Sequence, residues 1–411
     1  MAWQMHPKPR IAVVSPFLDK RHGTERCVAE QIERLADNFD IHLYSSMVDD
    51  VDLSKITWHR IPRFLGPHLA SYVWFFAANH LRRWWDRQFR KLEFDLVFSP
   101  GINCLDADII AVHIVFAEFY RLARQELALR HNPVRMWPWL IHRKLSYHLF
   151  IALERRIYTK DKLPLAVISH KMEQDLARCF GRKGHLSLVY HGVDSEHMNP
   201  ARRRSLREET RRGLQLPESA FAILLVGNDW KKKGLPCLIE AIGSLHNPDL
   251  WILVRGQDDS YSIRDLLRQQ GLEARMLVLP SIPQVESYYA AADMYVGPSL
   301  EDSFAIPPLE AMACGLPVIV SRQAGVSELL THNVDGFILN DPTDSRQLAE
   351  FIRAVYESAE LRERVSLSAT ATARQYTWQR NAEEMKRILD ECLLEKRRNV
   401  PDKRPSALTQ T

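Results

Sequence analysis

A lysine-rich turn is the first part of the sequence whose residue types could do chemistry. The segment GNDWKKKG, residues 227–234, directly follows an apolar run that ends at Val226, and a helical pattern starts at Leu235. A glycine turn, lysine charge and the free N–H groups of a helix N-terminus together favour an anion site, and a diphosphate fits such a site better than a carboxylate does. A solvated lysine run on a surface turn is an equally strong interpretation of this segment alone.

An acidic loop is the second candidate. The segment EDSFAIPPLEAMACG, residues 301–315, follows the apolar run 294–296. Its two prolines suit the first turn of a helix, where proline loses no hydrogen bond, so we expect Glu310 in that turn and Asp302 in the loop ahead of it. The two carboxylates would accept hydrogen bonds from sugar hydroxyls. For either acid alone, a plain structural role is the stronger interpretation.

Strands and helices must position both candidates. Apolar runs alternate with helical patterns in two series, at 11–14, 41–44, 96–98, 109–112, 166–168 and 186–189, and again at 222–226, 251–254, 276–279, 294–296 and 317–320. Near-continuous apolar strands separated by helices are typical of parallel sheets covered on both faces. We therefore expect an α/β protein with two Rossmann-like, doubly wound domains that face a central cleft. Ligands bind at the carboxyl ends of such strands, where both candidates fall.

The domain boundaries follow from charge and periodicity. We expect a first Rossmann-like domain at 1–200, a linker at 201–217, a second Rossmann-like domain at 218–375, a helix at 376–398 and a flexible tail at 399–411. Residues 201–213 are almost entirely charged and have no apolar stripe, which indicates a solvated linker or a surface helix.

Composition narrows the class of protein. The 411 residues are 46% apolar and 26% charged, which is typical of a multidomain globular protein. The formal net charge of +4 is a weaker bias than duplex nucleic-acid binding requires, so we expect no nucleic-acid partner. The six cysteines form no C-x-x-C pair, which favours a reducing compartment. With no apolar stretch in residues 1–10, we expect a cytoplasmic protein.

Five segments, in chain order, resemble one family. They are Gly23–Arg26, similar to G-G-x-x-R; His191–Asp194, similar to N-G-V-D; residues 227–234, similar to G-R-x-x-x-x-K-G; Tyr289–Ser299, similar to A-D-x-x-x-x-P-S; and Asp302–Glu310, similar to E-x7-E. Together they resemble the retaining, GT-B-fold glycosyltransferases of family 4.

The resemblance implies a nucleoside-diphosphate sugar as co-substrate, with no other cofactor. It also implies that 1–200 is the acceptor-side domain, that 218–375 binds the nucleotide sugar, and that the helix 376–398 returns to the first domain. It implies that Glu310 binds the ribose, that Asp302 contacts the donor sugar, and that Lys233 neutralises the diphosphate. His113, at the end of the run 109–112, matches a histidine that faces the reacting sugar in relatives, although a core histidine is the simpler interpretation. The implied catalytic residues are His113, Lys233 and Asp302, and the implied donor-binding residues are Gly23, Thr24, Gly227, Asn228, Lys232, Lys233, Ser303, Phe304, Ala305, Ile306 and Glu310.

Some residues depart from the family pattern. Asn228 stands where many relatives carry arginine, so one phosphate contact is lost or passes to Lys231 or Lys232. Asp302 is one methylene shorter than the family's glutamate. His22 replaces a glycine, which puts the local turn geometry in doubt.

We expect no metal. The pair Asp106 and Asp108 has Asp-x-Asp spacing but precedes its strand, which is the wrong end for ligand binding. Lysine charge and a helix dipole are therefore expected to replace a divalent cation.

Two stretches, 64–91 and 135–156, interleave aromatic with basic residues. Such surfaces can lie on an anionic membrane, where lipid-linked acceptors reside. The simpler interpretation packs the helix on the sheet with its arginines in water, and we expect this of at least half of the aromatics.

The sequence as a whole predicts a retaining glycosyltransferase that acts on a hydroxyl acceptor, which is a glycan, a lipid-linked molecule or a small molecule. The alternatives are an epimerase or phosphorylase of the same fold, and a non-catalytic nucleotide-sugar-binding scaffold.

Overall fold

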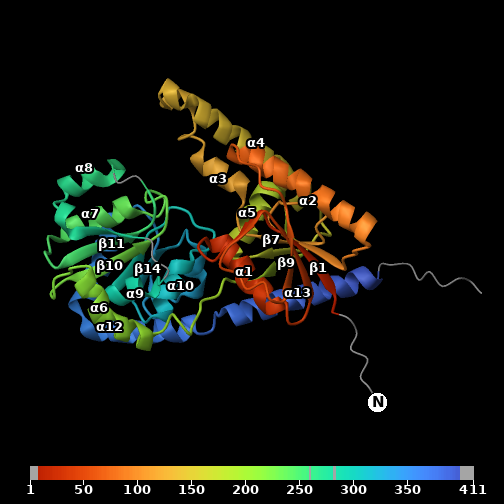
Figure 1. Ribbon diagram of the computed structural model, residues 1–411. Helices are drawn as coiled ribbons and strands as arrows, with labels where there is room; N and C mark the ends of the chain where they lie inside the picture. The colour runs from red at the N-terminus through yellow and green to blue at the C-terminus, as the bar shows by residue number, and fades with distance from the viewer. Residues whose placement is uncertain (1–7, 259–260, 281–283, 399–411) are drawn as a thin grey trace, which may run out of the picture. The chain divides into compact units, whose positions relative to one another are not determined.

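The computed structural model describes residues 8–258, 261–280 and 284–398, and these form two compact units (Figure 1). The first unit holds the residues up to Val167, Glu173–Val189 and the residues from Ala382 onward. The second holds Ile168–Met172 and Tyr190–Asn381. The tail expected at 399–411 lies outside the described residues.

The first unit is built on a seven-stranded sheet with the order β5-β3-β1-β6-β7-β8-β9, in which every pairing is parallel. Its strands are β1 (Arg10–Val14), β3 (Asp40–Ser45), β5 (Ile56–Arg60), β6 (Leu96–Pro100), β7 (Ile109–Val112), β8 (Leu165–Val167) and β9 (Leu186–Leu188), and β2 (Phe17–Leu18) pairs with β4 (Met47–Val48) beside it. Its helical elements are α1 (Gly23–Leu35), α2 (His68–Arg90), α3 (Phe116–Ala123), η1 (Leu129–His131), η2 (Val134–Met136), α4 (Trp137–Tyr158) and most of α5 (His170–Phe180) and α13 (Trp378–Arg398).

Alternate residues of β1 show how this sheet is covered on both faces. Ile11 and Val13 pack in a core with α1 and with Leu389 of α13, whereas Ala12 and Val14 pack in a separate core with Phe75 of α2. In Figure 1, α2 and α4 accordingly lie on the opposite side of the first unit from α13. A period of two along a strand sends successive side chains to opposite faces, so both faces need a helical layer.

The second unit is built on a six-stranded parallel sheet with the order β12-β11-β10-β13-β14-β15. Its strands are β10 (Phe221–Val226), β11 (Leu250–Arg255), β12 (Met276–Leu279), β13 (Met294–Gly297), β14 (Val318–Ser321) and β15 (Phe337–Leu339). Its helical elements are α6 (Pro200–Gly213), α7 (Leu235–Leu245), α8 (Tyr261–Gln269), η3 (Glu273–Arg275), α9 (Glu286–Ala291), α10 (Ile306–Ala313), η4 (Gly325–Leu329), α11 (Ser345–Glu357) and α12 (Ala359–Ala373).

The segment expected to be a solvated linker or a surface helix, 201–217, is largely helix α6. Arg203, Arg207 and Arg211 recur one turn apart, and their guanidinium groups donate to carbonyls at the end of α9 and to Asp293. Cations at a helix C-terminus satisfy its unpaired carbonyls and complement its dipole. The charged stripe therefore packs on α9 rather than lying in water.

The simpler interpretation of the aromatic stretch 64–91 was wrong for most of its aromatics. Phe75 is buried and Tyr72 and Phe76 are half-buried, whereas Trp74, Trp84, Trp85 and Phe89 are between 39% and 66% exposed. The reason is that the buried face of α2 is polar, as its contacts below show.

Candidate functional site

Two glycines shape the lysine turn after β10. Gly227 has a φ of +151°, and a Cβ there would approach the Cε of Lys233 to 2.7 Å. Gly234 has a φ of +81°, caps the start of α7, and would bring a Cβ to 2.0 Å from the carbonyl oxygen of Pro298. Any side chain at either position would push the turn away from its neighbours, so glycine is what lets the lysine lie across the strand end.

The lysine turn and the acidic loop meet at the carboxyl edge of the second sheet. The Lys233 ammonium forms an ion pair with the Asp302 carboxylate, and the Leu300 amide donates to the Lys232 carbonyl at 2.7 Å. The strands that end at these loops, β10 and β13, are neighbours in the sheet. Two segments about seventy residues apart therefore form one charged group, with a cation facing an anion.

The neighbouring polar residues of the turn point to other partners. The side-chain oxygen Oδ1 of Asn228 accepts from the backbone amide of Gln257 at 2.8 Å, which ties the turn to the loop after β11. Lys232 pairs with Asp229 at 2.9 Å. Lys233 therefore faces the acidic loop, Lys232 pairs within its own turn, and the Asn228 side chain braces that turn.

The backbone of 303–306 is fixed ahead of α10. The Ser303 carbonyl accepts from the Ser169 hydroxyl at 2.8 Å, and the Phe304 carbonyl accepts from the Val326 amide at 2.7 Å. Ala305 caps α10 with a φ of +70°, a strained value for a residue with a side chain. These contacts hold a sharp bend between Asp302 and Ile306, and Pro307 follows at the start of the helix, as predicted.

Glu310 lies deeper than predicted. Helix α10 begins at Ile306, so Glu310 is one turn in rather than in the first turn. The residue is 5% exposed, and its carboxylate accepts from the Tyr289 hydroxyl at 2.6 Å. Burial, together with the charge of Glu310, raises the pKa of Tyr289 well above its ordinary value, so this tyrosine stays a hydrogen-bond donor.

His113 lies in the first unit, directly after β7, and is 5% exposed. Burial penalises the charged imidazolium and lowers the pKa of His113 to about 4. The imidazole is therefore neutral at neutral pH.

A cavity of about 470 Å³ opens beside His113 in the first unit. Its wall includes Thr24 from the start of α1, whereas Gly23 is not part of the lining. Most of the wall is apolar, and the aromatic share comes from Phe17, Phe64, Tyr72, Trp74, Phe75, Phe116, Phe150 and Tyr158. The sequence did not predict this cavity, because its lining is spread over residues 15–158 with no common spacing.

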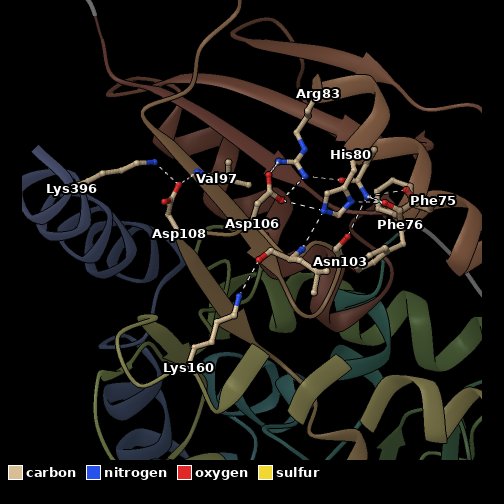
Figure 2. Close-up of polar contacts among 12 residues, drawn as sticks. Phe75, Phe76, His80, Arg83, Val97, Asn103, Asp106, Asp108, Lys160 and Lys396 are labelled. Carbon is tan, nitrogen blue, oxygen red and sulfur yellow. Dashed lines mark hydrogen bonds and ion pairs between the residues drawn. The ribbon is translucent and has the colours of Figure 1, made fainter. Parts of the chain in front are cut away.

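The carboxylates of the Asp-x-Asp pair have protein partners (Figure 2). Asp106 accepts from Arg83 at 2.6 and 2.8 Å, and Asp108 accepts from the Val97 amide and from Lys396, both at 2.8 Å. Although partial burial opposes it, hydrogen bonds from His80 and Arg83 hold the pKa of Asp106 well below its usual range. Both acids therefore tie elements of the first unit together.

Two residues that the sequence analysis missed lie next to the acidic loop. Lys171 forms an ion pair with Glu301, and the Glu328 carboxylate accepts from the backbone amides of His170 and Lys171 at 2.8 and 2.7 Å. A carboxylate at these amides caps the start of α5. Lys171 and Glu328 each lie more than a hundred residues from the residues that they bind, so the local sequence pattern could not predict these contacts.

Family models match two successive parts of the chain. The model for Glycosyltransferase Family 4 matches residues 21–197, and the model for Glycosyl transferases group 1 matches residues 207–372. The chain belongs to glycosyltransferase family 4.

Among curated relatives, the D-inositol 3-phosphate glycosyltransferase of Arthrobacter sp. (strain FB24) is 27% identical over 208 residues, 48% of either chain. That of Paenarthrobacter aurescens (strain TC1) is 30% identical over 200 residues, 46% of this chain and 48% of its own. The chain thus matches about half the length of these relatives.

Solved structures of glycosyltransferases share the whole fold. WaaG, a glycosyltransferase involved in lipopolysaccharide biosynthesis, has a TM-score of 0.75 at 18% identity, over 92% of this chain and 99% of its own. Sucrose-phosphate synthase from Thermosynechococcus elongatus has a TM-score of 0.73 at 17% identity, over 94% of the present chain and 100% of the synthase chain. The predicted fold class, GT-B with two parallel α/β domains, is confirmed. The predicted cleft stays a prediction.

Proposed function

We propose that this protein is a glycosyltransferase that moves a sugar from a nucleoside-diphosphate sugar to a hydroxyl acceptor, with retention of the anomeric configuration. The observation that carries the proposal is the Lys233–Asp302 ion pair at the strand ends of the second unit, in the loop that leads into the helix of the buried Glu310. A cation, a sugar-binding acid and a ribose-binding acid are the groups that a nucleotide-sugar donor requires. Retention rests on the family membership.

Lys233 stabilises the leaving group. As the bond to the sugar breaks, negative charge builds up on the diphosphate, and a fixed cation stabilises it. A diphosphate that enters takes over the ammonium from Asp302, whose carboxylate is then available to the sugar hydroxyls. The backbone amides of 304–306 and the start of α10 add partial positive charge on the same side. Glu310 accepts hydrogen bonds from the ribose.

His113 supplies a neutral imidazole from the first unit. Because its pKa is about 4, the ring can donate to or accept from a sugar hydroxyl without adding charge. Thr24 lines the same cavity, so the acceptor is placed there.

The donor itself is the co-substrate, and no divalent cation takes part. Lys233 and the helix dipole take the place that a metal has in other transferases. Activity measured after exhaustive treatment with EDTA should equal untreated activity, and restoration of lost activity by magnesium or manganese would contradict this part of the proposal.

We place the enzyme in the cytoplasm, with peripheral contact to the inner face of a membrane. Within the described residues, no helix combines the length and the apolar character needed to cross a bilayer. Structures of HepE from Anabaena contain UDP and glucose or UDP-glucose, which supports a nucleotide-sugar donor here by fold analogy.

Calorimetry with UDP, GDP and ADP tests the donor site. We expect one of the three to bind, and Glu310→Gln to weaken it at least about tenfold, since an amide is a poorer acceptor for ribose hydroxyls. Failure of all three to bind would overturn the proposal. Product analysis then separates the reactions, because a transferase releases nucleoside diphosphate in proportion to glycosylated acceptor, an epimerase releases none, and a scaffold binds without turnover.

A further inference from the structure

Helix α2 carries its polar face inward and its apolar face outward. Its buried residues are Phe75, Asn79, Arg83 and Asp86. Asp86 is fully buried and accepts from the Tyr44 hydroxyl at 3.0 Å, while Arg83 binds Asp106, as Figure 2 shows. These bonds fix the rotation of the helix, so its apolar face cannot turn toward the core.

The outward face of α2 is aromatic and aliphatic. Val73, Trp74, Leu81, Trp84, Trp85 and Phe89 are all between 39% and 66% exposed. A water-soluble helix normally has the opposite arrangement, and an exposed patch of this kind marks an interaction site.

The start of α4 continues the pattern. Trp137, Trp139, Ile141 and Leu145 are exposed there, as is Met136 of the preceding η2. Of the 21 large hydrophobic residues exposed in the described chain, 15 lie between residues 64 and 145. Exposed apolar side chains are thus concentrated on one part of the first unit, and we call the exposed residues of α2, η2 and the start of α4 the aromatic face. In Figure 1, α2 and α4 lie on the same side of the unit.

Positive charge accompanies the aromatic face. Residues 63–91 hold six basic residues and one acid, the buried Asp86, and residues 129–145 hold four basic residues and no acid. Arg90 lies 5.0 Å from the centre of the Trp85 ring, and Arg143 lies 5.1 Å from that of Trp139. Tryptophans with adjacent cations suit the headgroup level of an anionic bilayer. Two copies of so cationic a face would repel each other, which argues against a dimer contact.

The cavity beside His113 adjoins this face. Phe64 and Trp74, 43% and 45% exposed, line the cavity and also belong to the exposed stretch. Deeper in, Tyr72 and Phe150 stack edge to face with centroids 4.8 Å apart, which joins α2 to α4. An apolar ligand leaving a bilayer at the aromatic face would therefore meet an apolar wall that leads to His113.

We propose that the first unit docks on an anionic bilayer through the aromatic face and takes its acceptor from it, an amphiphile whose hydroxyl reaches His113 while its apolar part occupies the cavity. The proposal rests on the proposed function for the identity of the reaction. It adds the partner surface and the chemical class of the acceptor.

Vesicle co-sedimentation tests the docking. The protein should bind vesicles of equal parts phosphatidylglycerol and phosphatidylcholine, bind pure phosphatidylcholine far less, and lose binding as salt is raised. The double variant Trp84→Ser, Trp85→Ser should lower the partition coefficient at least about tenfold. Its matched control is Leu367→Ser, which removes an exposed leucine of α12 in the second unit and should bind like wild type.

Three results would overturn the docking. They are no binding to anionic vesicles, equal binding to both vesicle types, and unchanged binding by the double variant. A self-association that the double variant abolishes in sedimentation velocity, without vesicle binding, would assign the face to a second copy of the chain instead.

Thermal shifts with n-decanol and n-butanol test the cavity. The long-chain alcohol should raise the melting temperature and the short one should not. Ser71→Trp, which places an indole in the cavity, should remove the decanol shift while leaving vesicle binding intact. If that variant melts at a lower temperature than wild type without ligand, Phe64→Ser at the rim of the cavity is the substitute.

A decanol shift that both variants keep would overturn the acceptor assignment. Nucleoside-diphosphate calorimetry on the same samples separates this outcome from a failure of the proposed function, since donor binding belongs to the second unit.

Discussion

Lys233 is the residue whose removal tests the donor chemistry most directly. Lys233→Met keeps the stem that lies across Gly227 but deletes the charge opposite Asp302. We expect turnover to fall by roughly a hundredfold or more, because the departing diphosphate loses its cation. Initial rates at saturating donor measure this. The control is Arg268→Met, which removes an exposed cation of α8 in the same unit; if both variants lose activity equally, the lysine acts only through the net charge.

His113 makes a prediction about pH. Its ordinary pKa is 6.5, and in the fold it is about 4, so between these values the unfolded chain binds a proton that the folded protein does not. The stability must therefore fall as the pH drops through this window, by up to about 3 kcal/mol from this group. His113→Gln should remove that share, which urea unfolding at neutral pH and near pH 4 would detect.

The comparison needs a control substitution at an exposed position that does not titrate. Gln88 on α2 is exposed, so Gln88→Ala should leave the pH dependence of the unfolding free energy as it is in the wild type. An identical loss of stability on acidification in wild type and His113→Gln would show that the imidazole is not the buried neutral group described above.

At the scale of the element, α2 depends on its buried acid. Asp86 is fully buried and has Tyr44, Arg82 and His59 around it, with the Arg82 Nε at 3.2 Å. Asp86→Ala should lower the free energy of unfolding by about 3 kcal/mol, because it leaves buried donors and cations without their anion. Chemical denaturation measures the loss. Arg87→Ala, on the exposed side of the same helix, should change it by less than about 0.5 kcal/mol.

The elements also show what the sequence could and could not predict. Central strands such as β1 and β10 are apolar on both faces, so their runs were evident, whereas the edge strands β5 and β15 are short or alternate with exposed residues and were missed. For α2, helical spacing separates a polar from an apolar face but does not say which one is buried. The bonds of Asp86 and Arg83 decide that, and both partners, Tyr44 and Asp106, lie far away in sequence.

Part of the candidate site could likewise be predicted from the sequence, and part could not. The lysine turn and the acidic loop were predictable because each is local and follows a strand end. The depth of Glu310, the Lys233–Asp302 pair and the cavity beside His113 were not, since each depends on where one segment lies against another.

At the scale of the whole molecule, the first unit is held together by the end of the chain. Met385, Ile388 and Leu389 of α13 are buried in the same core as Val13 and Ile32. Leu389→Ala should lower the free energy of unfolding by about 3 kcal/mol, the typical cost of a cavity in a core. Leu394→Ala is the matched control, since Leu394 is 53% exposed on the same helix, and urea unfolding should show it near wild type. Equal losses in the two variants would mean that α13 does not pack as described.

This closure by α13 has a consequence for synthesis. A ribosome makes the strands of the first unit early, but the hydrophobic stripe that seals one face of their sheet is translated near the end, after all of the second unit. Until then, Val13, Ile32 and their neighbours lack part of the helical layer that covers them, so the first unit of the growing chain is incomplete. The second unit is nearly continuous in sequence, since it consists of Tyr190–Asn381 and the short piece Ile168–Met172. It can therefore fold before α13 has been made. The first unit is therefore started earlier on the ribosome but can be completed only after the second unit has been made.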